Sequence, residues 1–100
     1  MSYDLAFLPS ARREWDKLGA TVRVQFRRKL TERLEAPRAP ADALHGMPDH
    51  YKIKLRSSGY RLVYRVEDAK VTVIVVAVGK RERNAVYRSA AKRAERGGGE

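Results

Sequence analysis

Alternation of apolar and polar residues predicts four strands in this chain. The first is short, over residues 3–8, and Pro9 ends it. Three more lie in the second half: 51–56 and 60–66 alternate along their length, whereas 70–78 is apolar on both sides. A strand that is apolar on both sides is typical of the inside of a sheet that is covered on both faces. We therefore expect 70–78 to be the central strand.

A different spacing predicts helices before and after these strands. Residues 20–35 carry one apolar stripe, with an apolar residue at every fourth position: Val22, Phe26, Leu30 and Leu34. A shorter helix over 10–18 precedes it, with Ser10 as its N-cap and Trp15 expected in the core rather than stacked on a base. The last helix, over 82–95, has a thin apolar face made mostly of alanine. We expect it to dock weakly and to be displaceable by a partner.

The predicted order of elements is β-α-α-β-β-β-α, which indicates an α+β fold. We expect a small antiparallel-rich sheet with the N-terminal helical hairpin packed on one face. The 100 residues suit a single domain, over 1–96, followed by a flexible glycine-rich tail, 97–100. The longest apolar run, 71–78, is too short to span a membrane and no signal peptide is visible, so we expect a cytoplasmic protein. The lack of cysteine excludes disulfides, cysteine zinc sites and a cysteine nucleophile.

The chain is strongly basic, and most of the excess lies in its second half. It has 22 Lys and Arg against 12 Asp and Glu, for a formal net charge of +10. Residues 1–50 contribute +2 and residues 51–100 contribute +8. A field of one sign attracts polyanions, so nucleic acid or the ribosome is the expected partner. The alternative is a basic surface that only keeps the protein soluble or pairs with an acidic protein.

Cations gather on one side of two predicted strands: Lys52, Lys54 and Arg56 on the first, Arg61 and Arg65 on the second. Three more cations and a tyrosine follow the central strand: Lys80, Arg81, Arg83 and Tyr87. If the two cationic sides coincide, five residues converge on one concave surface of the sheet: Lys52, Lys54, Arg61, Arg81 and Tyr87. The register of the hairpin decides whether they coincide, and the sequence leaves that register open.

These residues can support RNA chemistry without a metal. No carboxylate lies on the Lys52 and Lys54 side, and both histidines, His45 and His50, precede the sheet. Cations could stabilise the extra negative charge of a pentacoordinate phosphorus transition state. Crowding by other cations favours the neutral form of a lysine, which could then take a proton from a 2′-hydroxyl. The alternative is a face that binds phosphates without catalysis, because Lys and Arg clusters mostly position a nucleic-acid backbone.

The loop before the sheet holds a weaker candidate, for a metal site: Asp42, His45, Asp49 and His50. The spacing of these residues is loose and matches no metal-binding pattern. We interpret them as ordinary polar loop residues. We expect neither a metal nor a cofactor in this protein.

Three segments resemble the RelE toxins of bacterial toxin–antitoxin pairs. They are GMPDHYKIKLRSSGYRLVY over 46–64, EWDKLG over 14–19, and VGKRER over 78–83 followed by Val86 and Tyr87. The resemblance extends over nearly the whole chain, and the long central motif makes it specific. It implies a small α+β fold like that of microbial ribonucleases. It also implies cleavage of messenger RNA in the ribosomal A site, with the 2′-hydroxyl as nucleophile and without a metal.

The resemblance also implies roles for single residues. Lys52 and Lys54 match the strand lysines of the family, one of them a candidate general base or phosphate ligand. Arg61 matches the arginine that stabilises the transition state. Arg81 matches one near the leaving group, where we expect electrostatic stabilisation because arginine is a poor proton donor. Tyr87 matches a tyrosine assigned to base stacking and proposed for proton transfer.

The remaining candidates are expected to contact RNA or the ribosome: Arg56, Arg65, Lys80, Arg83 and His45. At position 45 the close relatives carry arginine, so the histidine weakens that expected contact. The family further implies a RelB-like antitoxin, acidic or amphipathic, that wraps the chain, covers the basic face and displaces the last helix.

The second implied partner is the 70S ribosome with messenger RNA in its A site. Operator DNA is expected only through the antitoxin complex, and no membrane contact is expected. The alternative function is that of a non-enzymatic toxin similar to ParE, which inhibits gyrase. ParE-like members generally lack the cationic set with Tyr87, so its presence here favours the ribonuclease.

Overall fold

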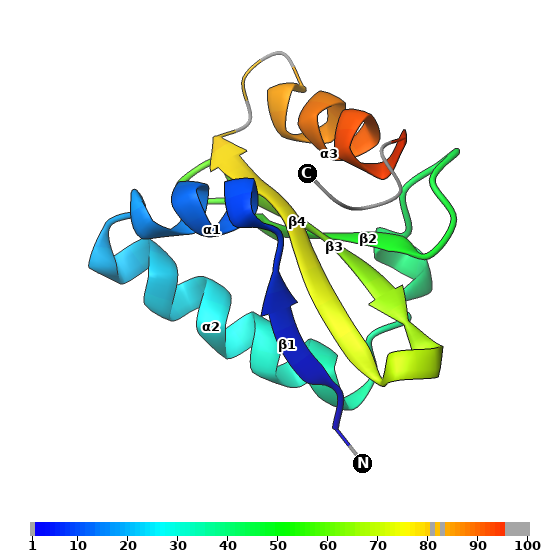
Figure 1. Cartoon of the computed structure of the whole chain (residues 1–100). Coiled ribbons are helices and arrows are strands. Elements are labelled where there is room, and N and C mark those ends of the chain that lie inside the picture. Colours follow the sequence, from blue (N-terminus) through cyan, green and yellow to red (C-terminus); the bar gives the residue numbers. More distant parts are fainter. Residues whose placement is uncertain (1, 81, 83, 96–100) are drawn as a thin grey trace.

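The computed structural model describes residues 2–80, 82 and 84–95, which form a four-stranded sheet and three helices (Figure 1). In chain order the elements are β1 (Asp4–Phe7), α1 (Pro9–Asp16), α2 (Ala20–Glu35), β2 (His50–Leu55), β3 (Tyr60–Glu67), β4 (Thr72–Lys80) and α3 (Ala85–Glu95). Short 3-10 helices lie at Pro40–Asp42 and Asp68–Lys70. The element order and the α+β class confirm the prediction. The predicted tail, 97–100, lies outside the described residues.

The starts of two helices differ from the predicted ones. α1 begins at Pro9, and its N-cap is Leu8, so the prediction of Ser10 as the cap is wrong. Proline is favoured at the first helical position because its fixed φ suits the helix and its missing N–H needs no partner there. α3 begins at Ala85 instead of residue 82, directly after Asn84, whose φ of 59° lies in the left-handed region.

β4 begins two residues later than predicted. The segment Asp68–Lys70 forms a 3-10 turn, and Val71 then takes a left-handed backbone conformation with a φ of 48°. A β-branched residue rarely adopts this conformation. The apolar pattern therefore suggested strand where the chain is still turning, and regular pairing starts only at Thr72.

The strands are ordered β1-β4-β3-β2, so β4 lies inside the sheet as predicted (Figure 1). β2, β3 and β4 form an antiparallel meander, and β1 pairs with β4 in parallel. β1 ends at Phe7, opposite Val75, whereas β4 continues to Lys80. Beyond Val75, the outer edge of β4 is therefore not covered by β1.

A β-bulge interrupts the pairing of β3 with β4. Val63 pairs with Ala77 and the next residue, Tyr64, pairs with Val75, which makes Val76 an extra residue of β4. An extra residue changes which backbone groups point to each side of a strand. Here it turns the carbonyl of Val76 toward the edge that β1 leaves uncovered, where a side chain binds it.

α2 lies on one face of the sheet, and α1 lies beside β4 near the end of β1 (Figure 1). Phe26 and Leu30 of the predicted stripe are buried in the core. Trp15 of α1 is buried as well, with its ring centroid 5.4 Å from that of Phe7 and 6.3 Å from that of Phe26. These contacts confirm the prediction that Trp15 belongs to the core.

α3 lies on the other face of the sheet from α2 (Figure 1). Its apolar face is thin, as predicted, because its buried residues are Val86 and Ala90. Gly79 of β4 permits the close packing, since a Cβ at that position would stand 3.2 Å from Val86 Cγ2. None of the helices in the described part of the chain is long and apolar enough to cross a membrane.

Candidate functional site

The register of β2 and β3 brings the predicted cations onto one side of the sheet. Lys54 is the direct partner of Arg61, and Lys52 is the direct partner of Val63. Directly paired residues point to the same face, so the two cationic sides coincide. Arg61 pairs in turn with Gly79 of β4, which continues this face toward α3. We call Lys52, Lys54 and Arg61 the cationic face.

Burial differs between the three side chains. Arg61 is only 7% exposed, and its guanidinium donates a hydrogen bond of 3.0 Å to the Tyr60 carbonyl. Lys52 is half-buried and Lys54 is exposed. Among the described residues, none of the three cations has an ion-pair partner. A buried guanidinium without a carboxylate favours the binding of an anion beside it.

α3 extends over one end of this face and carries Tyr87. Val86, its neighbour, packs on Gly79 of the cationic side of β4. Tyr87 is partly exposed and packs against the rim of the core. The first turn of α3 therefore lies beside the Arg61 end of the sheet. Arg81 and Arg83, both predicted for this site, lie outside the described residues.

The other predicted contacts are dispersed. Arg65 pairs with Glu67 at 2.8 Å, which neutralises part of its charge. Lys80 is the direct partner of Tyr60, and its Nζ lies 5.6 Å from the centre of the Tyr60 ring. Because neighbouring residues of a strand point to opposite faces, the Lys80 side chain lies on the side of the sheet opposite the cationic face. His45 is exposed in the loop that precedes β2. The sequence had grouped these residues, whereas the structure pairs Arg65 with a carboxylate, places Lys80 on the opposite side of the sheet and leaves His45 in the loop before β2.

A groove of about 540 Å³ links the cationic face to α2. It is lined by Gln25, Arg28, Lys29, Glu32, Lys54, Leu55, Arg56 and Ser57. Lys54 thus belongs to both the groove and the cationic face. The groove has four cations against one carboxylate, so it favours a polyanion. The sequence predicted Lys54 and Arg56, but it did not predict Arg28 and Lys29 as their neighbours because they lie on a different element.

Arg33 of α2 holds the outer edge of β2. Its guanidinium donates hydrogen bonds to the Lys52 carbonyl at 3.2 Å and to the Tyr64 hydroxyl at 2.8 Å, and it pairs with Asp42. The Tyr64 hydroxyl donates in turn to the Pro37 carbonyl at 2.6 Å. Burial raises the pKa of Tyr64, so its hydroxyl keeps its proton. This network ties the backbone at Lys52 to α2 and to the loop that follows it.

The loop residues considered for a metal are not gathered into a ligand cluster in the described ranges. Asp42 belongs to the Arg33 network, and Asp49 pairs with Arg38 at 2.9 Å. His50 is 5% exposed, and its Nδ1 lies 2.8 Å from the Pro48 carbonyl. Burial lowers the pKa of His50 below its ordinary value, which keeps the ring neutral at neutral pH. These contacts hold Asp42, Asp49 and His50 within the fold.

Comparison with known proteins shows the family to which this chain belongs. Residues 5–85 match the family model of the ParE toxin of the type II toxin–antitoxin system, parDE. The chain is also 62% identical to the mRNA interferase toxin RelE of Escherichia coli, over 93% of this chain and 98% of the relative. The chain therefore belongs to the RelE family of this toxin superfamily. This confirms the resemblance found in the sequence.

Solved structures support the same assignment. A mutant of the E. coli toxin RelE in the free state matches with a TM-score of 0.87 at 60% identity, over 93% of this chain and 98% of that one. A chain of the intact E. coli RelBE toxin–antitoxin complex matches with a TM-score of 0.79 at 62% identity, over 82% of this chain and all of that one. The sheet and helices described above are thus those of RelE structures.

Proposed function

We propose that this chain is the toxin of a bacterial type II toxin–antitoxin pair and cleaves messenger RNA in the ribosomal A site. The observation that carries the proposal is Lys54 directly opposite the buried Arg61, on a face that has no carboxylate partner among the described residues. The identity of 62% to an mRNA interferase supports the same reaction. The protein is then an endoribonuclease that inhibits translation.

The reaction is an attack of the RNA 2′-hydroxyl on the adjacent phosphorus, without a metal. One lysine of the cationic face, Lys52 or Lys54, acts as the general base and accepts the proton of the 2′-hydroxyl while the bond from O2′ to phosphorus forms. The bond from phosphorus to O5′ then breaks and the departing O5′ takes up a proton from water, so the products are a 2′,3′-cyclic phosphate and a 5′-hydroxyl end. Arg61 stabilises the extra charge of the pentacoordinate intermediate, and it can do so at little reorganisation cost because the fold already holds it desolvated.

Two further roles complete the site. Arg81 stabilises the developing charge on the leaving oxygen, since its guanidinium is a strong electrostatic partner but a poor proton donor. Tyr87, partly exposed at the start of α3, stacks on a base next to the cleaved bond. Contacts that hold the flanking RNA or the ribosome are proposed for the outlying residues: Arg56, Arg65, Lys80, Arg83 and His45.

The ribosome is proposed as the place of reaction because the cationic face is open to solvent at Lys54. An open face binds phosphates but does not by itself align the 2′-oxygen with the scissile bond, so a rigid A site would supply that orientation. The cellular compartment is then the cytoplasm. We further propose one domain over 1–96 with a layout like that of microbial ribonucleases.

The second proposed partner is a RelB-like antitoxin. The solved RelBE complex is that of a close relative, and the net charge of +10 favours an acidic chain. Such an antitoxin would cover the cationic face and displace α3, which buries only two small side chains. Operator DNA would be bound only through the antitoxin complex.

A non-enzymatic toxin similar to ParE is the second candidate function. The match of residues 5–85 to the ParE toxin model favours it. In that case, the cationic face would bind its target without cleaving it.

The test is cleavage of a defined messenger RNA by the purified protein, with and without programmed 70S ribosomes that have an empty A site. We expect cuts only with ribosomes, and 2′,3′-cyclic or 3′-phosphate ends at the cuts. Lys54→Ala should lose cleavage, whereas Lys70→Ala, which removes an exposed lysine at the other end of β3, should keep it. Tight binding to ribosomes or gyrase without cuts in either reaction would support the ParE-like function instead.

A further inference from the structure

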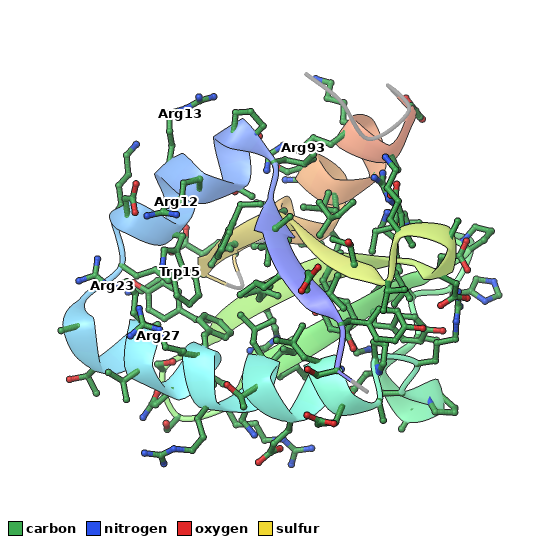
Figure 2. The ribbon with its side chains drawn as sticks, turned by 60° about the horizontal axis from the view of Figure 1, so that its bottom comes forward. Arg12, Arg13, Trp15, Arg23, Arg27 and Arg93 are labelled. Carbon is green, nitrogen blue, oxygen red and sulfur yellow. The ribbon has the colours of Figure 1, made fainter. Side chains whose placement is uncertain are left out.

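The edge of β4 that β1 leaves uncovered is closed by two side chains from distant parts of the chain. Arg93 of α3 donates a hydrogen bond of 2.7 Å to the Val76 carbonyl, the extra residue of the bulge. Glu14 of α1 accepts a hydrogen bond of 3.1 Å from the Val78 backbone N–H. Figure 2 shows Arg93 extending from α3 toward α1 and the end of β1. The Val76 carbonyl and the Val78 N–H are thereby satisfied.

The same two side chains also bind each other. The Arg93 guanidinium meets both carboxylate oxygens of Glu14, at 3.0 and 3.1 Å. The side chains are only 17% and 31% exposed, so water screens the pair weakly. Four groups therefore bind one another: the Arg93 guanidinium, the Glu14 carboxylate, the Val76 carbonyl and the Val78 N–H. We call these four residues the clasp.

The clasp lies on the stripe by which α3 docks. Val86, Ala90 and Arg93 follow one another at a spacing of four and three residues, so they share one side of the helix. The first two are buried, but together they offer little apolar area for holding a helix of 11 residues. Val86 fixes the beginning of α3 on Gly79, and the clasp fixes its last turn.

We propose that Glu14 and Arg93 are positioning residues of the active site. By fixing the last turn of α3, they set where its first turn, with Tyr87, stands beside the cationic face. Neither residue touches the reacting atoms. The inference rests on the proposed function, because it acts through the role of Tyr87 in binding RNA.

The clasp has a direction that an ordinary ion pair lacks. Arginine must face the carbonyl and glutamate must face the N–H. If the two residues are exchanged, the carboxylate meets the Val76 carbonyl and the guanidinium meets the Val78 N–H, so both backbone contacts become repulsive. The charge-exchanged protein should therefore not recover, although its two side chains can still form an ion pair.

Amide hydrogen exchange on the whole protein tests the docking of α3. We expect Arg93→Met to raise exchange rates along residues 85–95 by ~10-fold or more, as local opening becomes easier. Lys92→Met, which removes an adjacent exposed cation, should leave these rates unchanged. The exchanged pair E14R/R93E should stay as unprotected as Arg93→Met. Recovery of wild-type protection in the exchanged pair, or wild-type protection in Arg93→Met, would overturn the clasp.

Single-turnover cleavage on programmed ribosomes tests the link to Tyr87. Arg93→Met should slow cleavage by about 10- to 100-fold, the cost of a displacement near 1 Å. In a Tyr87→Ala background, Arg93→Met should not slow cleavage further, because both changes remove the same contact with RNA. An equal cost in both backgrounds would refute the positioning role. If Tyr87→Ala itself cleaves at the wild-type rate, the proposed role of Tyr87 fails, and the exchange data still decide whether the clasp exists.

Discussion

Replacement of Arg33 by methionine should destabilise this protein by about 2–3 kcal/mol. Methionine keeps most of the aliphatic stem, so the change removes mainly the guanidinium and its bonds. The Lys52 carbonyl then loses its partner at a half-buried edge, which costs ~1–2 kcal/mol. Loss of the charged hydrogen bond to the Tyr64 hydroxyl costs about 1 kcal/mol more, because that hydroxyl keeps its bond to the Pro37 carbonyl. The Asp42 side chain is 32% exposed and is hydrated once Arg33 is gone, so loss of the ion pair adds little to the free-energy cost.

Urea unfolding followed by circular dichroism measures this cost. A loss of that size should lower the midpoint by about 0.7–3 M, since a small domain has a slope of ~1–3 kcal/mol per M in urea. Arg28→Met removes an exposed arginine from the same helix and should change the free energy of unfolding by less than ~0.5 kcal/mol. Arg33→Lys should recover part of the loss, because an ammonium group can reach one of the acceptors. The reasoning is refuted if Arg33→Met unfolds at the wild-type midpoint, or if Arg28→Met costs as much.

Three other predictions concern the site and its frame. Arg81→Ala should reduce cleavage by several orders of magnitude with an unchanged unfolding midpoint; wild-type cleavage would remove Arg81 from the site. Gly79→Ala forces Val86 away and should cost ~1 kcal/mol or more, and Gly79→Ala with Val86→Ala should cost less than the sum of the single changes in urea unfolding. His50 has a pKa below 6.5 in the fold, so the unfolded chain binds more protons and stability should fall as the pH drops below about 6.5. His50→Gln should flatten that part of the pH profile, and an unchanged profile would contradict the assignment.

The bulge of β4 links the pairing of the strands to the position of α3. Without the extra residue, the carbonyl of Val76 would not face the edge at which Arg93 binds it. β1 ends at Phe7, so this edge has room for side chains instead of a further strand. Exposed strand edges invite unwanted pairing, and the clasp closes this one. The same contacts therefore protect an edge and hold the helix that carries Tyr87.

Local patterns were enough to predict the elements of the fold. The stripe that includes Phe26 and Leu30 became the buried side of α2, and the two-sided apolar run became the inner strand β4. Trp15 was expected in the core and lies there. Periodicity works for such features because burial on a helix or strand depends on neighbours a few residues away. The start of β4 escaped it, because Val71 takes a left-handed conformation that no apolar pattern indicates.

The candidate site was only half determined by local patterns. Alternation placed Lys52 and Lys54 on one side of a strand, but the pairing of Lys54 with Arg61 depends on the hairpin register. The ion pair between Arg65 and Glu67 depends on the conformations of the two side chains, which alternation does not predict. Sequence-based reasoning could name the cations, whereas it could not tell which of them stay without a carboxylate.

The sequence by itself indicated which residues are candidates for the chemistry and, for most of them, on which predicted elements they lie. Only the tertiary structure decided which of these elements meet. Arg28 on α2 and Arg56 after β2 line one groove, and Glu14 binds Arg93 across 79 positions of the chain. The physical reason is that periodicity reports the burial of a residue on its own element. Contacts between distant elements depend on strand order, on one bulge and on the length of β1, which set where each free backbone group and each charge comes to lie.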